Sequence, residues 1–221
     1  MVDIIFYFIF LLFVALVVRK WNKNEAKRKF IDKYGLCQPA EIALIMALKR
    51  IGFEDKQIFF NLYVPNGENY TQIDVLVVCR IGIIVFEVKD YNSAIFGGID
   101  EKYWHHTYIS HDTYQMYNPI IQNANHISCL KKHFSGFNML NVVVFFGNCR
   151  LRHTKFLSSK SCLIYAKDLF NCIKYLYYHN KQTNSKLKSE YLTKLKEFMQ
   201  NAHNEEIVAL HRVYVENKKY N

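Results

Sequence analysis

The sequence predicts an α/β domain that follows one N-terminal transmembrane helix. Three observations support this prediction: an uninterrupted apolar run near the amino terminus, a later series of helix-like and β-branched segments, and a hydrophobic content of 51% in 221 residues. This content allows a sizeable core and excludes disorder as a description of the whole chain. With only 3 Pro and 8 Gly residues, the chain is neither collagen-like nor of low complexity.

The apolar run covers residues 4–18, which are fifteen consecutive apolar residues (IIFYFIFLLFVALVV). Its length is near the short end of the roughly 17–25 residues that cross a bilayer, and a core helix would carry a polar face. A cleaved signal peptide is the alternative, but its positive charge should precede the apolar run. Here Asp3 precedes the run and basic residues follow it. We therefore expect residues 1–18 to be a transmembrane anchor that contacts lipid through residues 2–18.

Residues 19–36 are expected to form a basic linker beside the membrane. Residues 19–33 carry seven Lys or Arg against two acids, and the positive-inside rule then places the remaining chain in the cytoplasm of a single-pass cell-membrane protein. Contact with anionic lipid accounts for this cluster, so only the rest of the net charge of +10 is weak evidence for a nucleic-acid partner. Six Cys without a CxxC pair, mostly in apolar runs, indicate reduced core thiols in a cytosolic domain.

The first expected helix covers Pro39 to Ile51, and Glu41 falls near the middle of its apolar stripe. Glu41 is either a first-turn acid favoured by the helix dipole or an inward carboxylate that needs a partner. Strands are expected at 57–64, 72–79, 82–88, 141–146 and 161–165, and helices at 119–133, 167–179 and 186–202. Residues 205–215 could form either element, and residues 91–118 are expected to be a loop rich in Tyr and His.

The runs 72–79 and 82–88 are separated by two residues, which predicts a β-hairpin. If Cys79 faces Gly82, then Asp74 faces Glu87, and directly opposed residues have Cβ atoms roughly 5 Å apart. Two like charges at that distance are destabilising unless a cation lies between them. Lys89 projects from the same face of the strand as Glu87, because side chains alternate along a strand.

These residues suit metal-dependent phosphodiester hydrolysis. Mg²⁺ (or Mn²⁺) prefers oxygen ligands, which Asp74, Glu87, the Val88 carbonyl group and Glu41, directly or through water, could supply. Lys89 would hold or polarise the attacking water, or stabilise charge on the phosphate. The alternative is a chance pairing on a surface hairpin. Both acids interrupt apolar runs rather than alternate with them, which favours the functional interpretation.

The ordered set of motifs resembles the NERD (nuclease-related) domain, a branch of the PD-(D/E)xK nuclease superfamily. The resemblance covers about residues 38–165. It rests on Glu41, Thr71-Gln72-Ile73-Asp74, Phe86-Glu87-Val88-Lys89, Gly97-Gly98, Trp104 and Asn118-Pro119 with Gln122. It implies a restriction-endonuclease-like α/β core, a mixed sheet flanked by helices, over residues 37–166, with a C-terminal helical extension over 167–221.

The resemblance also implies roles for individual residues. Asp74, Glu87 and Lys89 would be the active-site triad, and Glu41 the accessory acid. The candidate substrate-binding residues are Gln72, Gln122 and His126. Position 126 is His where related exonuclease-like branches often have Tyr, and Ala40 stands where a Gly often precedes the helix acid.

The leading hypothesis is a membrane-anchored, cytoplasmic, Mg²⁺-dependent nuclease that acts on DNA rather than RNA. One alternative is an inactive nuclease-fold module that binds nucleic acid or a partner protein at the membrane. Another is a scaffold in which the acids pair with Lys89. The chain has no GxxxxGK loop, so ATP hydrolysis is not expected. We expect Trp104 to pack against other side chains rather than to stack on bases. We expect His105, His106 and His111 to belong to a polar loop rather than to a metal site.

Overall fold

The structure, a computed structural model, describes residues 25, 28–108, 112–152, 156–181 and 189–219. Within these ranges no helix is long and apolar enough to cross a membrane. The predicted anchor at residues 1–18 lies outside the described residues, so it stays a prediction. The chain divides into two compact units, Met1–Cys37 and Gln38–Asn221, and each is described by itself.

The described part of the first unit is helical over residues 28–34. Two ion pairs with a spacing of four residues support this helix: Lys29 with Glu25 at 2.8 Å and Arg28 with Asp32 at 4.0 Å. The predicted basic linker therefore contains helical structure at its C-terminal end.

The second unit contains a six-stranded mixed sheet with the strand order β1-β2-β3-β7-β10-β9. The antiparallel strands β1, β2 and β3 are followed by β7 and β10, which run parallel to β3, and β9 pairs antiparallel to β10. Their bounds are β1 Ile58–Asn66, β2 Asn69–Cys79, β3 Gly82–Asp90, β7 Met139–Phe146, β9 Phe156–Leu157 and β10 Ser161–Tyr165. This mixed α/β architecture agrees with the fold class predicted from the sequence.

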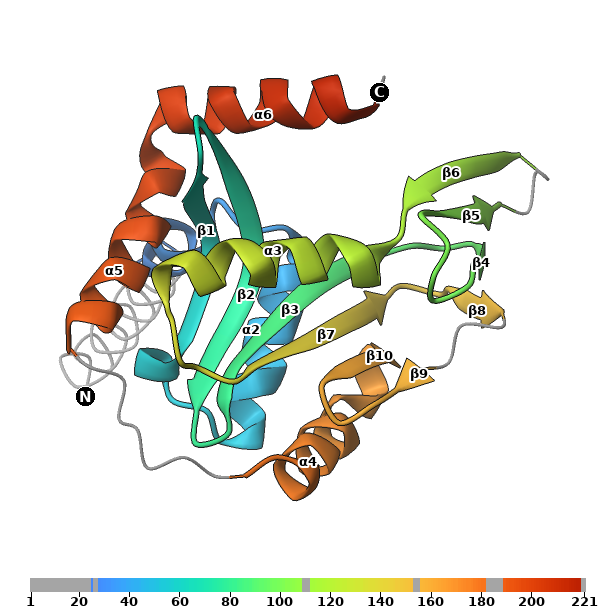
Figure 1. Cartoon of the computed structure of the whole chain (residues 1–221), viewed down its shortest axis with the longest axis horizontal. Helices are drawn as coiled ribbons and strands as arrows, with labels where there is room; N and C mark the ends of the chain where they lie inside the picture. Colours follow the sequence, from blue (N-terminus) through green and yellow to red (C-terminus); the bar gives the residue numbers. More distant parts are fainter. Residues whose placement is uncertain (1–24, 26–27, 109–111, 153–155, 182–188, 220–221) are drawn as a thin grey trace, which may run out of the picture. The chain divides into compact units, whose positions relative to one another are not determined.

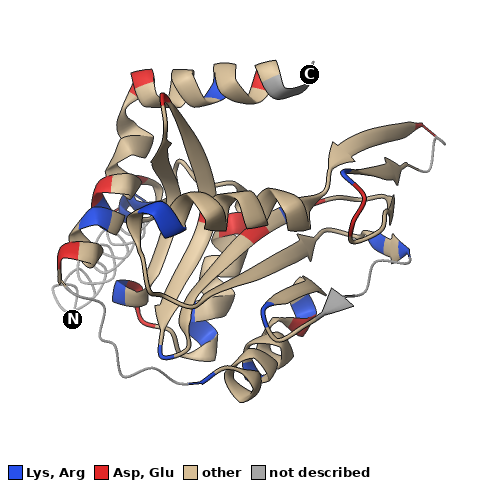
Figure 2. Ribbon diagram, in the orientation of Figure 1, with Lys and Arg blue, Asp and Glu red and all other residues tan. Residues whose placement is uncertain are grey.

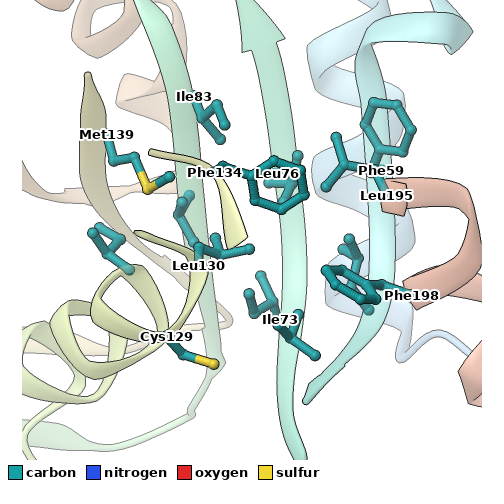
Figure 3. Close-up of a cluster of buried hydrophobic side chains, with 14 residues drawn as sticks. Phe59, Ile73, Leu76, Ile83, Cys129, Leu130, Phe134, Met139, Leu195 and Phe198 are labelled. Carbon is teal, nitrogen blue, oxygen red and sulfur yellow. The ribbon is translucent and has the colours of Figure 1, made fainter. Parts of the chain in front are cut away.

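Helices cover both faces of this sheet (Figure 1). Helix α2 (Pro39–Ile51) lies behind β2 and β3, and α3 (Pro119–His133) crosses in front of them. Figure 3 shows the core beneath α3 and α5 (Ser189–Gln200), where Leu76 and Ile73 of the sheet meet Leu195, Phe198 and Phe134. The remaining elements are η1 Asp55–Gln57, η2 Ala166–Asp168, α4 Leu169–His179, η3 Asn201–His203 and α6 Glu205–Lys219.

A second, four-stranded sheet corrects the prediction of a loop over residues 91–118. Its order is β6-β5-β4-β8, with bounds β4 Ala94–Phe96, β5 Tyr103–Thr107, β6 Thr113–Tyr117 and β8 Arg150–Arg152. These strands are short and mix aromatic with polar residues, so they lack the β-branched runs that predict strands. Their inner side chains are buried by distant residues: Ile95, Trp104 and Met116 belong to one cluster with Val143 and Phe145 of β7.

The packing role expected for Trp104 is confirmed, because its side chain is fully buried. The indole Nε1–H donates a hydrogen bond of 2.7 Å to the Gly98 carbonyl oxygen. A Cβ atom at Gly97 would lie 2.1 Å from the indole ring, so only glycine permits this approach. The packing of Trp104 therefore explains the glycine at position 97.

Most other elements follow the sequence prediction. The first helix, the helix from Pro119 to His133 and the strand from Ser161 to Tyr165 have the predicted bounds. The ambiguous segment after residue 205 is helical. In α3, however, Asn123 is buried and Ala124 is exposed, although the buried face of a helix usually takes the apolar residue. The reason is tertiary: the Asn123 side-chain amide donates hydrogen bonds of 2.8 Å to the Val85 carbonyl and to Asn141 Oδ1.

Candidate active site

The candidate site lies where β2 and β3 separate. Their ladder runs from Cys79–Gly82, as predicted, to Val75–Phe86, where the recorded pairs end. Gly82 has a φ of 122°, a conformation that favours glycine and permits the tight turn. Beyond the last pair, β1 and β2 continue toward α6, whereas β3 follows β7 in another direction (Figure 1). The next residues along the two strands are Asp74 and Glu87.

Asp74 also lies at an irregular point of the β1–β2 ladder. Phe60 pairs with Val75 and Leu62 with Ile73, but no pair is recorded between Asn61 and Asp74. Asn61 has a φ of 49°, in the left-handed region that asparagine tolerates better than most residues. The Asp74 Oδ2 atom accepts a hydrogen bond of 2.8 Å from the Val88 N–H group. A side-chain carboxylate thus replaces a backbone acceptor at the divergence of the strands.

Glu87 is the most deeply buried acid of the site, with 2% of its surface exposed. Its Oε1 atom lies 2.7 Å from the Lys89 Nζ atom. Its Oε2 atom lies 3.3 Å from His126 Nε2, but without the geometry of a hydrogen bond, and has no hydrogen-bond partner among the described residues. The other His126 nitrogen, Nδ1, lies 2.8 Å from the Thr71 hydroxyl oxygen.

Helix α3 supplies the groups that hold Glu87 and Lys89. Lys89 Nζ donates a hydrogen bond of 3.1 Å to Gln122 Oε1, one helical turn before His126. The Asn118 side chain caps the helix by accepting hydrogen bonds from the N–H groups of Ile120 and Ile121. The same side chain donates to the carbonyl groups of residues 98, 99 and 101, which ties the loop before β5 to the start of α3. Gln122 and His126, four residues apart in α3, therefore both point at the site.

Glu41 combines both of its predicted features. Its Oε2 atom accepts a hydrogen bond of 3.0 Å from the Gln38 N–H group, so the acid closes a capping box in the first turn of α2. The side chain is also buried, with 5% of the residue surface exposed. The sheet in front of α2 brings this carboxylate close enough to Asp74 for its charge to raise the pKa of Asp74.

Asp74, Glu87 and Lys89 differ in the direction and causes of their pKa shifts. Burial raises the pKa of Asp74 well above its ordinary value, and the charges of Glu87 and Glu41 raise it further, against Lys89 and the Val88 hydrogen bond. Burial alone would raise the pKa of Glu87, but Lys89 and His126 outweigh it and lower that pKa. Burial would lower the pKa of Lys89, but the charges of Glu87 and Asp74 raise it. Asp74 is therefore the acid whose negative charge the site favours less than that of Glu87.

The residues fit a divalent cation by chemistry. The donors are carboxylate oxygens, which hard cations prefer, and one of them, Glu87 Oε2, is buried without a hydrogen-bond partner in the described structure. A cation would also relieve the repulsion that raises the pKa of Asp74. Within the described residues, however, no three His, Cys, Asp or Glu side chains are grouped as a set of metal ligands. Here Glu87 pairs with Lys89, Asp74 with the Val88 N–H group and Glu41 with the Gln38 N–H group.

The charged groups of the site stand apart from the other charges of the molecule. Figure 2 shows acidic positions beside α3 and behind it, in the middle of the second unit, whereas most other charges lie on outer helices and turns. Charged side chains are seldom buried unless they are paired or bind a ligand. The fold and this buried group of acids with one lysine fit a nuclease-like α/β domain.

Comparison with known proteins agrees with this class. Residues 38–146 match the family model of the nuclease-related domain, NERD, and over these residues the chain belongs to that family. An uncharacterized protein of Bacillus anthracis is 27% identical over 158 residues, which are 71% of this chain and 72% of that protein. No solved structure matches the chain.

Several residues near the site were not predicted from the sequence. Thr71 lies within a recognised motif, but its contact with His126 joins positions 55 residues apart. Asn61 accepts a hydrogen bond of 3.1 Å from the Gln72 side chain, and only its positive φ distinguishes it. His211 and Arg212 lie on α6 beyond the family match. One sequence signal was available, because Asn61, like Asn141, is a polar residue within an apolar run. It could have directed attention to the strand that contains Asn61.

Proposed function

We propose that this chain is a divalent-metal-dependent nuclease of the PD-(D/E)xK superfamily with a restriction-endonuclease-like core. In this proposal Asp74, Glu87, the Val88 carbonyl group and Glu41 would hold Mg²⁺ or Mn²⁺. The observation that carries the proposal is the buried Glu87 carboxylate, whose Oε2 atom accepts no hydrogen bond within the described residues, beside an Asp74 whose pKa is raised by burial and further by its acidic neighbours. Clusters of buried groups with shifted pKa values are typical of functional sites.

Each side chain has a proposed task. A bound divalent cation supplies charge neutralisation at the phosphate and a more acidic water. The Lys89 ammonium group, already oriented by Glu87 and Gln122, would hold the attacking water or stabilise charge on the phosphate. His126 contacts protein groups through both nitrogens, so we assign it to the positioning of Glu87 rather than to direct substrate contact. Gln122 and Gln72 remain candidates for contact with the substrate.

The substrate is proposed to be DNA rather than RNA, and the domain to act in the cytoplasm, anchored to the cell membrane through residues 2–18. The basic charge of the chain suits a nucleic acid, and the apolar run before the basic linker supports the membrane anchor. A reporter fused to the carboxyl terminus should then be protected from external protease in intact cells. Digestion of the reporter in sealed cells would reverse the proposed orientation.

Cleavage by the full-length chain in detergent tests the nuclease activity. Labelled single-stranded and duplex DNA should be cut with Mg²⁺ or Mn²⁺ and left intact with EDTA. The variant Lys89→Ala should lose activity, whereas Lys160→Ala, at an exposed lysine, should retain it. Cleavage that survives Lys89→Ala unaltered would show that the active-site assignment is wrong.

A second candidate is a non-catalytic module that binds nucleic acid or a partner protein at the membrane. The observation in its favour is that the acids are already engaged by protein groups and do not form a set of ligands within the described residues. This candidate predicts salt-dependent binding of DNA without cleavage by either metal. Metal-dependent cleavage that Lys89→Ala abolishes would exclude it.

A further inference from the structure

A pocket beside the candidate active site is bordered by the C-terminal helix α6. Its volume is about 290 Å³, and its lining residues are Tyr63, Gln72, Val208, His211, Arg212, Val215 and Glu216. Five of these seven belong to α6, beyond the residues that match the family model. The pocket is thus formed by a part of the chain to which the family match assigns no role.

The floor of the pocket comes from the β1–β2 hairpin, near the turn that joins its two strands. Tyr63 of β1 pairs with Gln72 of β2, and Gln72 precedes Asp74 by two residues in the same strand. Side chains two apart in a strand share a face, although the irregular Asn61–Asp74 step lies close by. The Gln72 side chain is held by its hydrogen bond to Asn61. Gln72 therefore places the pocket floor two residues from Asp74 along β2.

Helix α6 is held against this hairpin by defined contacts. The His211 Nδ1 atom lies 2.8 Å from the Tyr70 carbonyl oxygen, so Nδ1–H is the donor. The His211 ring meets the Tyr63 ring edge to face, with centroids 5.4 Å apart and an interplanar angle of 88°. Just before α6, the Asn201 amide donates a hydrogen bond of 2.9 Å to the Tyr63 carbonyl oxygen. These contacts fix the α6 wall of the pocket relative to the strands that carry Asp74.

The pKa shifts of two residues, Tyr63 and His211, indicate that the pocket lies within electrostatic range of the candidate active site. Burial raises the pKa of Tyr63. The charge of Arg212 opposes this rise and the charge of Glu41 adds to it, so the Tyr63 phenol lies within electrostatic range of both charged side chains. Burial lowers the pKa of His211, and the His126 ring contributes to this lowering. Groups on α6 therefore act on the same side chains that surround Asp74 and Glu87.

We propose that this pocket binds the nucleotide next to the scissile phosphate, in a single-stranded part of the nucleic acid. This inference rests on the proposed nuclease function and names its substrate class. Arg212 pairs with a backbone phosphate, the His211 ring and the two valines present a surface to the base, and the Gln72 amide contacts a polar edge. Glu216, one turn after Arg212, repels a second phosphate and limits the site to one.

The size of the pocket supports a single strand. Small-molecule sites have volumes of roughly 300–1,000 Å³, and this pocket, at about 290 Å³, lies just below that range. It holds one unpaired nucleotide but not a stacked base pair, whose outer edges are joined to a second backbone. Base-stacking surfaces beside a cation that follows the backbone are the usual means of single-strand binding.

The test compares the substitution of two arginines, each exposed on a helix, in the full-length chain. Arg212→Gln removes the pocket cation, and Arg50→Gln is the matched control, at the opposite end of α2 from Glu41. The probe is a fluorescein-labelled ten-nucleotide oligothymidine, measured by anisotropy with Ca²⁺ in place of Mg²⁺. We expect Arg212→Gln to weaken binding about tenfold and to reduce the salt slope by about 1, with Arg50→Gln within twofold of the original chain.

Two further variants sharpen the result. Val215→Trp fills the pocket without a change of charge and should weaken single-strand binding by a similar factor, while Arg212→Lys should restore part of the affinity. The same changes should raise KM for single-stranded substrate and leave kcat nearly unchanged, because they remove binding rather than chemistry. Equal binding by Arg212→Gln and Arg50→Gln, or a loss only for duplex DNA, would overturn the inference.

The two proposals fail in distinguishable ways. If the original chain never cleaves with Mg²⁺ or Mn²⁺, the proposed nuclease function fails, and the anisotropy comparison still decides whether the pocket binds a strand. If the chain cleaves normally and Arg212→Gln matches Arg50→Gln in KM and affinity, the pocket inference alone fails.

Discussion

The two ends of the β2–β3 hairpin differ in every property that matters for function. At the closed end, Val75 to Cys79 pair residue by residue with Gly82 to Phe86, and most of the side chains are fully buried apolar groups. At the open end, Asp74, Glu87 and Lys89 follow directly after the last recorded pair. One end is therefore core, and the other carries buried charge.

The difference shows how one hairpin can serve both stability and chemistry. At the closed end the backbone groups satisfy each other, so the side chains are free to form the core. At the open end the strands separate, and the Asp74 carboxylate takes the place of the backbone acceptor for the Val88 N–H group. Charges at this end are tolerated because Lys89, His126 and the cap of α2 partly compensate them. The remaining repulsion between the acids is what a cation can relieve.

The largest effect is expected at the open end. Glu87→Gln preserves the shape of the side chain but removes the charge that orients Lys89, so cleavage should fall by about 10²–10³-fold. The measurement is the single-turnover rate of cleavage of labelled DNA with Mg²⁺, with the folded state checked by circular dichroism. A folded Glu87→Gln chain with the original rate would contradict the comparison.

The closed end should affect stability instead. Leu76 is fully buried in the main core cluster, so Leu76→Ala should lower the free energy of unfolding by about 3 kcal/mol. Urea titration gives this value, and cleavage measured well below the transition should stay within a few-fold of the original. If Leu76→Ala removed activity in a fully folded chain, the two ends would not be separable.

A substitution of Asp74 should raise the stability of the folded chain at high pH, whereas the substitution of Leu76 lowers it. Because the folded state raises its pKa, this carboxyl group contributes stability that is present below its ordinary pKa and lost as the pH rises through the raised value. Asp74→Asn stays neutral and should raise Tm at pH 8 without metal by about 2–4 °C, a gain that vanishes near pH 4. Ca²⁺ should then raise the Tm of the original chain more than that of the variant. A lower Tm for Asp74→Asn at pH 8 would show that the Val88 hydrogen bond outweighs the repulsion.

The smallest effect is expected at α6, above the open end. Burial lowers the pKa of His211, so its contribution to stability is present above the ordinary histidine pKa and is lost as the pH falls below about 6.5. Between pH 7.5 and pH 5.5, the original chain should therefore lose more stability than His211→Gln, by under about 1 kcal/mol. Urea titrations at the two pH values measure the difference, and equal losses would contradict the prediction.

Local signals made several elements predictable. Pro39 and Pro119 begin the helices that they were expected to begin, because proline suits the first turn and cannot donate a backbone hydrogen bond. The hairpin register followed from two residues between two β-branched runs, and Gly82 permits the turn. Four of the six cysteines are buried, as their apolar neighbours indicated. By contrast, the second sheet was missed, because its strands are stabilised by partners that are distant in the sequence.

The sequence by itself determined which residues could carry charge at the open end of the hairpin, because strand alternation and a two-residue turn fix which positions face each other. It also determined that Gln122 and His126 share one face of a helix, which follows from the helical repeat. Only the tertiary structure decided that this face meets Glu87 and Lys89, that Glu41 lies near Asp74 and that α6 closes a pocket over Gln72. These contacts join segments that no local periodicity relates, and they form because the helices must bury their apolar faces against the sheet.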